Sequence, residues 1–123
     1  MATLPPLPED KLWDLINQHT EKFRPIEERL WEMIRIPPVR WQEHQYGGQT
    51  GGFWAVAVFG QQVIWYNEIE EGFNLSNFHR HGEIAEYWCD QLDLNHVVIR
   101  LVHALQSGGP AYVSRMGPPQ SLE

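Results

Sequence analysis

The sequence predicts a single α+β domain, with helices near both ends of the chain packed on an antiparallel sheet of about four strands. Two observations support this prediction. Apolar residues recur at helical spacing near both ends, whereas alternating and two-sided apolar stretches fill the middle. The 123 residues suffice for one core and are too few for two, so we expect one domain over residues 1–123.

Two helical stretches are expected before the sheet. Between residues 9 and 24 one face collects Leu12, Leu15, Ile16, His19 and Phe23. A similar stripe follows in Ile26, Leu30, Met33 and Ile34. Pro25 predicts a break between them, because proline lacks a backbone N–H and disfavours helical geometry in the preceding residue. We interpret both stripes as core-facing, and the alternative is a surface for a partner helix.

The middle of the chain has the pattern of strands. The prolines of IPPVRW end the second helix, and a strand is expected over residues 39–46. The stretch FWAVAVFGQQVIWYNEI predicts a hairpin with Gly60 in its turn. Residues 53–59 are apolar on both faces, which is typical of a central strand covered on each side. A further strand is expected over residues 83–88.

The last predicted element is a helix. Asp90 is expected to cap it, with Asp93 in its first turn and Gly108 as its stop. Its apolar side collects Leu94, Val97, Val98, Leu101 and Leu105. Residues 108–123 are rich in glycine and proline, and we expect an irregular tail there.

Charge limits the classes of partner. The formal net charge is −7, and residues 41–99 hold eight Asp and Glu side chains against Arg80 alone. Binding to a phosphate backbone requires Lys and Arg, so no nucleic-acid partner is expected. The longest apolar run, FWAVAVF, falls far short of the roughly 20 residues that span a bilayer, so no membrane insertion is expected.

The cysteine count and the N-terminus bear on localisation. One cysteine cannot form an internal disulfide, and MATLPPLPED lacks the basic and apolar regions of a secretory signal. These features predict a cytoplasmic protein.

The segment EIEEGFNLSNFHRHGEIAEYWC, residues 68–89, concentrates the side chains with functional potential. Its carboxylates and aromatic rings predict a surface that contacts a basic protein, with charge steering the encounter and aromatic side chains anchoring it. The assigned contact residues are Glu68, Glu70, Glu71, Phe73, Phe78, Glu83 and Trp88. The chain would then be a noncatalytic binding domain of inhibitor, immunity or adaptor type. Alternatively, the carboxylates only keep the surface soluble.

His79, His81 and Glu83 suggest a second function. They occupy alternate positions, so a strand would point all three to one side. Imidazole and carboxylate groups are usual ligands of zinc and non-haem iron. The alternative to a cofactor-free binding domain is therefore a small metal-dependent enzyme. Gly82 inside the triplet indicates a turning backbone, which argues against this alternative.

Three other features have structural interpretations. Glu68 and Glu70 share a strand face and could divide acid and base roles, but a solvated strand end is the preferred interpretation. Cys89 follows two aromatic residues and is interpreted as a small buried side chain. The two-sided strand FWAVAVF and the six tryptophans exceed what one layer of helices can cover, which predicts a homodimer.

Overall fold

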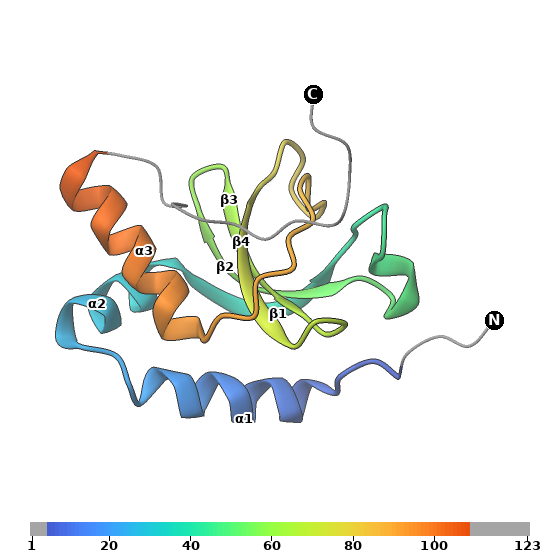
Figure 1. Cartoon of the computed structure of the whole chain (residues 1–123), viewed down its shortest axis with the longest axis horizontal. Helices are drawn as coiled ribbons and strands as arrows, with labels where there is room; N and C mark the ends of the chain where they lie inside the picture. Colours follow the sequence, from blue (N-terminus) through green and yellow to red (C-terminus); the bar gives the residue numbers. More distant parts are fainter. Residues whose placement is uncertain (1–4, 109–123) are drawn as a thin grey trace.

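The computed structural model describes residues 5–108, which hold three α-helices, a short 3-10 turn and four strands (Figure 1). The strands pair antiparallel in the order β1-β2-β3-β4. In chain order, the elements are α1 Glu9–Thr20, α2 Pro25–Ile34, β1 Arg35–Trp41, η1 Gly47–Gln49, β2 Phe53–Phe59, β3 Gln62–Asn67, β4 Gly72–Asn77 and α3 Leu94–Ser107. The predicted α+β fold is confirmed.

The break between α1 and α2 falls where Pro25 predicts it. α1 ends at Thr20, and Pro25 begins α2, a position whose N–H has no helical partner in any case. Arg24 and Glu27 form a capping box, in which the Arg24 N–H donates to Glu27 Oε1 at 2.9 Å. The Arg24 guanidinium also pairs with Glu27 Oε2, so the buried carboxylate is neutralised locally.

α2 presents a different set of side chains to the core from the predicted one. Its buried residues are Glu27, Leu30, Trp31 and Ile34, which follow the i, i+3, i+4, i+7 spacing of one helical face. Met33, predicted to belong to this stripe, is instead 78% exposed. The stripe prediction is therefore wrong at Met33, because this residue lies off the buried face and Trp31 is in the core.

β1 begins earlier than predicted, directly after α2. Its pairing with β2 shifts between Arg35, opposite Ala57, and Val39, opposite Ala55, so β1 carries extra residues at this point. Residues 36–38 fill this bulge and include two prolines. Because β1 is an edge strand, their missing N–H groups are tolerated there.

The central hairpin forms as predicted, with β2 and β3 joined at Gly60, whose φ is 60°. Both strands have a neighbour on each side. Val56 and Ile64 enter an apolar cluster shared with the helices, whereas Ala55 and Trp65 enter a second cluster. The chain therefore covers both faces of its most apolar strand by itself. Self-association stays a prediction.

The prediction of a strand over residues 83–88 is wrong. This segment is irregular: Glu83 forms an isolated bridge to Gln42, just after β1, and polar side chains tie residues 86–90 to β4. Ser76 Oγ donates to the Glu86 carbonyl at 2.7 Å, and the Asp90 N–H donates to Asn74 Oδ1 at 2.9 Å. The fourth strand is β4, whose sequence GFNLSN carries the asparagines and the serine that hold the irregular segment in place.

α3 begins three residues later than predicted, because Asp93 and not Asp90 precedes its first turn. Asp90 is engaged with Asn74 instead. The Leu94 N–H donates to His19 Nδ1 of α1 at 2.9 Å, so a histidine from another helix satisfies a donor at the α3 N-terminus. Gly108 ends α3 in a left-handed conformation, as predicted. The predicted irregular tail, beyond Gly108, lies outside the described residues.

Candidate binding site

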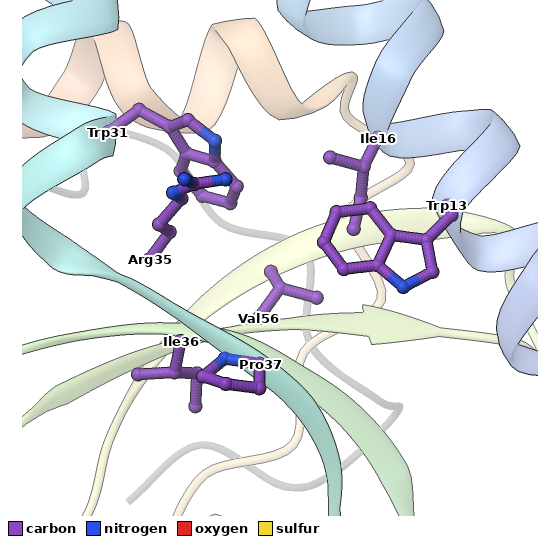
Figure 2. A pocket seen from close by; sticks show the side chains of 7 residues that line it. All are labelled: Trp13, Ile16, Trp31, Arg35, Ile36, Pro37 and Val56. Carbon is purple, nitrogen blue, oxygen red and sulfur yellow. The ribbon is translucent and has the colours of Figure 1, made fainter.

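A cleft of about 310 Å³ opens where α1, α2 and β1 meet (Figure 2). It is lined by Trp13, Ile16, Trp31, Arg35, Ile36, Pro37 and Val56, and we call it the two-tryptophan cleft. Figure 2 shows Trp13 from α1 and Trp31 from α2 on opposite sides, with Ile16 and Val56 between them. The walls are therefore aromatic and the floor is aliphatic.

Local contacts hold the two indoles in place. The Trp13 Nε1–H donates to Glu9 Oε2, one helical turn earlier, at 3.2 Å. Trp31 is only 5% exposed and meets the ring of Phe23 edge-on, with 6.0 Å between ring centroids. Trp13 is half-buried, so its ring keeps a solvent-facing part. The cleft consequently has one fixed wall and one partly exposed wall.

The cleft continues into a second hollow of about 160 Å³ along α1 and α2. The two hollows share Trp13, Ile16, Trp31 and Arg35, and the second is also lined by Asn17, Thr20, Phe23, Glu28 and Glu32. Arg35 pairs with Glu32 at 3.2 Å. Glu28 is exposed, and no ion pair to its carboxylate forms among residues 5–108. The rim therefore offers a carboxylate to an incoming cation.

Two features explain why sequence reasoning missed this cleft. Trp13 lies next to Leu12 but outside the predicted apolar stripe of α1. Only residues of that stripe are predicted to belong to the core. The sequence prediction assigns Met33 to the buried face of α2 and leaves Trp31 off that face, whereas the structure buries Trp31 and exposes Met33. A tryptophan at the solvent boundary of an amphipathic helix was the available signal, since such a ring presents apolar surface to water.

The predicted partner-binding residues divide into buried and exposed groups. Phe73 is fully buried and Phe78 is 8% exposed, so the expectation that they present aromatic surface is wrong. The Glu68 side chain is 5% exposed and pairs with Arg40. Solvent reaches the remaining members, Glu70, Glu71, Glu83 and Trp88. Contact with a basic partner through these residues stays a prediction.

Much of the negative charge of residues 41–99 is bound within the fold. Glu43 Oε1 accepts backbone N–H groups of the following turn, at 2.6 Å from Tyr46 and 2.9 Å from Gly47. Glu86 accepts the Asn77 N–H at 2.9 Å. These carboxylates shape loops and are less available to a partner than their number suggests.

The predicted metal-binding triplet does not form a site. Gly82 has a φ of 94°, and the Glu83 N–H closes a turn onto the Arg80 carbonyl at 3.0 Å. His81 packs against the Trp41 ring, with 4.8 Å between centroids, whereas His79 and Glu83 line a cleft to which His81 does not contribute. Within residues 5–108, no three His, Cys, Asp or Glu side chains are placed to hold a metal ion.

Cys89 also fits its structural interpretation. It is half-buried beside the second apolar cluster, and burial raises the pKa of its thiol. The neighbouring Tyr87 has its pKa raised to about 12, chiefly by burial. A thiol with a raised pKa carries little of the thiolate that nucleophilic catalysis needs.

Comparison of the chain with protein-family models, with curated proteins and with solved structures gives no match. In the part of the chain that the structure describes, no helix is long and apolar enough to cross a membrane. Function therefore has to be inferred from the chemistry of the site itself.

Proposed function

We propose that this chain is a noncatalytic protein-binding domain whose two-tryptophan cleft receives an apolar side chain of a basic partner protein. The observation that carries the proposal is the pair of indoles on opposite sides of a cleft with an aliphatic floor, of which Trp13 is half-buried (Figure 2). The lining is mainly aromatic and aliphatic, and its charged side chains are Glu28, Glu32 and Arg35.

The cleft has the chemistry of an interface anchor. Tryptophan dominates binding hot spots because its large, rigid ring buries much apolar area and loses little conformational entropy. Filling the cleft would bury the half-exposed ring of Trp13 and complete its packing. Truncating such an anchor typically costs about 2 kcal/mol, which is about 30-fold in Kd.

Charge supports a basic partner. The net charge of −7 attracts positively charged proteins over distances of about a Debye length, roughly 8 Å at physiological ionic strength. Near the cleft, Glu28 can meet a Lys or Arg that flanks the inserted apolar side chain. Half-buried Glu70 and exposed Glu71 contribute to the overall field from the β3–β4 turn. Charge would thus govern the association rate, and the cleft would govern the lifetime of the complex.

The test uses matched variants of the full chain. Proteins captured from the source cells by the wild type are compared with those captured by Trp13→Ala and by Met33→Ala, which removes an apolar side chain that is 78% exposed outside the cleft lining. The candidate lost with Trp13→Ala is purified, and its Kd is measured for all three chains by calorimetry.

We expect Trp13→Ala to raise the Kd at least tenfold and Met33→Ala to leave it within about twofold. Circular dichroism and thermal unfolding establish that both variants are folded. A purified partner that binds folded Trp13→Ala as tightly as the wild type would refute the cleft as the contact site.

A further inference from the structure

The N-terminal segment is held near the end of β1, where contacts to one backbone unit fix it. The Leu7 N–H donates to Glu68 Oε2. The Leu7 carbonyl accepts from Trp54 Nε1 at 2.8 Å and from Arg40 Nη2 at 3.1 Å. Three side chains, from β1, from β2 and from the residue that follows β3, therefore contact both polar groups of a single residue. We call them the Arg40–Trp54–Glu68 clamp.

The clamp is rigid and partly desolvated. Arg40 and Glu68 form an ion pair whose side chains are 22% and 5% exposed. Arg40 also donates to the Gly52 carbonyl at 2.7 Å, and its guanidinium lies 4.5 Å from the centroid of the Trp54 ring. Each clamp residue is thus oriented by its neighbours within the sheet, which favours binding because little side-chain entropy remains to be lost.

The segment held by the clamp is an extended proline-rich stretch. Residues 5–8 read Pro-Pro-Leu-Pro, and Pro8 has φ −66° and ψ 153°, the values of a polyproline II helix. Leu7 precedes a proline and is biased to the same region. Beside the segment a cleft of about 330 Å³, lined in part by Tyr66, Glu68 and Glu71, remains open to solvent.

These contacts have the chemistry by which proteins recognise proline-rich ligands. An indole N–H donating to a ligand carbonyl, next to aromatic rings, suits a polyproline II segment, whose carbonyls are not engaged internally. The clamp adds a carboxylate for one N–H. Since proline has no N–H, the clamped position must be a residue other than proline between two prolines. The chemistry therefore defines a Pro-x-Pro ligand.

We propose that the Arg40–Trp54–Glu68 clamp is a binding site for an extended Pro-x-Pro segment of another protein, and that residues 5–8 occupy it in cis. A tethered segment acts at an effective concentration in the millimolar range, so it competes with an external ligand. Opening the cis contact should then strengthen binding in trans, because the apparent Kd falls as the fraction of accessible sites rises. This site is separate from the two-tryptophan cleft.

The experiment uses the full chain and a fluorescein-labelled peptide that carries residues 5–10, Pro-Pro-Leu-Pro-Glu-Asp. The Leu7→Pro variant of the chain keeps the extended conformation but removes the N–H that donates to Glu68, which weakens the cis contact. Fluorescence anisotropy should show the peptide binding Leu7→Pro about tenfold more tightly than the wild type. A second peptide with the same Leu7→Pro change is the matched control and should bind neither chain.

Further variants keep the result interpretable. If Leu7→Pro does not fold, Pro6→Gly is used, which loosens the cis segment by backbone entropy and preserves the Leu7 donor and acceptor. Arg40→Lys in the opened chain should lower peptide affinity, because a single ammonium cannot reach both Glu68 and the Leu7 carbonyl as a guanidinium does. A folded, opened chain that binds the peptide no better than the wild type overturns the proposal. Equal binding of the two peptides would do so as well.

Discussion

The two apolar clusters of the sheet are covered in different ways. The helices cover the first cluster with periodic apolar side chains such as Leu12 and Leu101. The irregular segment 78–92 contributes to the second and is held to β4 by amide, hydroxyl and carboxylate groups. Apolar burial therefore dominates the stability of the helical cover, whereas satisfied hydrogen bonds set the geometry of the irregular cover.

The first prediction concerns the helical cover. Leu12→Ala should lower the free energy of unfolding by about 3 kcal/mol, since Leu12 is fully buried and its truncation leaves a cavity. Denaturant unfolding measures the change. Leu105→Ala is the matched control: Leu105 is 54% exposed, so its truncation should cost less than about 0.5 kcal/mol. Similar costs for the two variants would contradict the assigned core.

The second prediction compares two acidic residues near the end of β3. Glu68→Gln should destabilise the protein by about 3 kcal/mol, because it leaves Arg40 without its anion at a partly buried position. Glu70→Gln should change stability by less than about 0.5 kcal/mol, since solvent reaches Glu70. Thermal unfolding distinguishes them. If both variants unfold at the same temperature as the wild type, the Glu68–Arg40 ion pair does not stabilise the fold.

The third prediction concerns the irregular cover. The Ser76 hydroxyl accepts from Trp65 Nε1 at 2.9 Å and donates to the Glu86 carbonyl at 2.7 Å. Ser76→Ala leaves both groups without this partner and should cost about 2 kcal/mol. Hydrogen exchange should accelerate most in residues 78–92. Faster exchange confined to α1 would instead mean that the hydroxyl does not hold this segment.

The fourth prediction is a pH dependence of the helical cover. Burial lowers the pKa of His19 below its ordinary value of 6.5, and its Nδ1 must be unprotonated to accept the Leu94 N–H. Below pH 6.5 the unfolded chain therefore binds more protons at this site, so stability should fall as the pH decreases through this range.

Denaturant unfolding between pH 5 and 7.5 measures that dependence. His19→Gln should flatten it, whereas His103→Gln, at an exposed position of α3, should preserve it. An unchanged slope in His19→Gln would assign the dependence to another group.

The contrast between the helical cover and the irregular cover explains how much of the fold could be predicted. The break at Pro25, the hairpin turn at Gly60 and the stop at Gly108 follow from backbone rules that act locally. β4 could not be predicted, because Asn74 and Ser76 are polar in sequence and buried in the fold through partners far along the chain. Tertiary hydrogen bonds leave no periodic signal.

The candidate site was harder to predict than the fold. Its chemistry depends on helix packing that brings Trp13 opposite Trp31, and no local sequence spacing encodes the packing of one helix on another. Conversely, the composition of residues 68–89 predicts a partner-binding surface there. Its buried members, Glu68 and Phe73 among them, hold the structure together. Composition locates polar groups but does not tell whether the fold uses them internally.

In the proposed complex the partner contacts the two-tryptophan cleft, and Glu70 and Glu71 only assist the encounter. The most direct measurement is the Kd of one purified partner for two variants of the full chain, Trp13→Ala and the double variant Glu70→Gln/Glu71→Gln, at low and physiological salt. Trp13→Ala should raise the Kd at least tenfold at both salt concentrations, and the double variant by less than about threefold, mainly at low salt. A larger rise in Kd for the double variant than for Trp13→Ala would place the contact on the turn that carries Glu70 and Glu71, and would contradict the proposed role of the cleft.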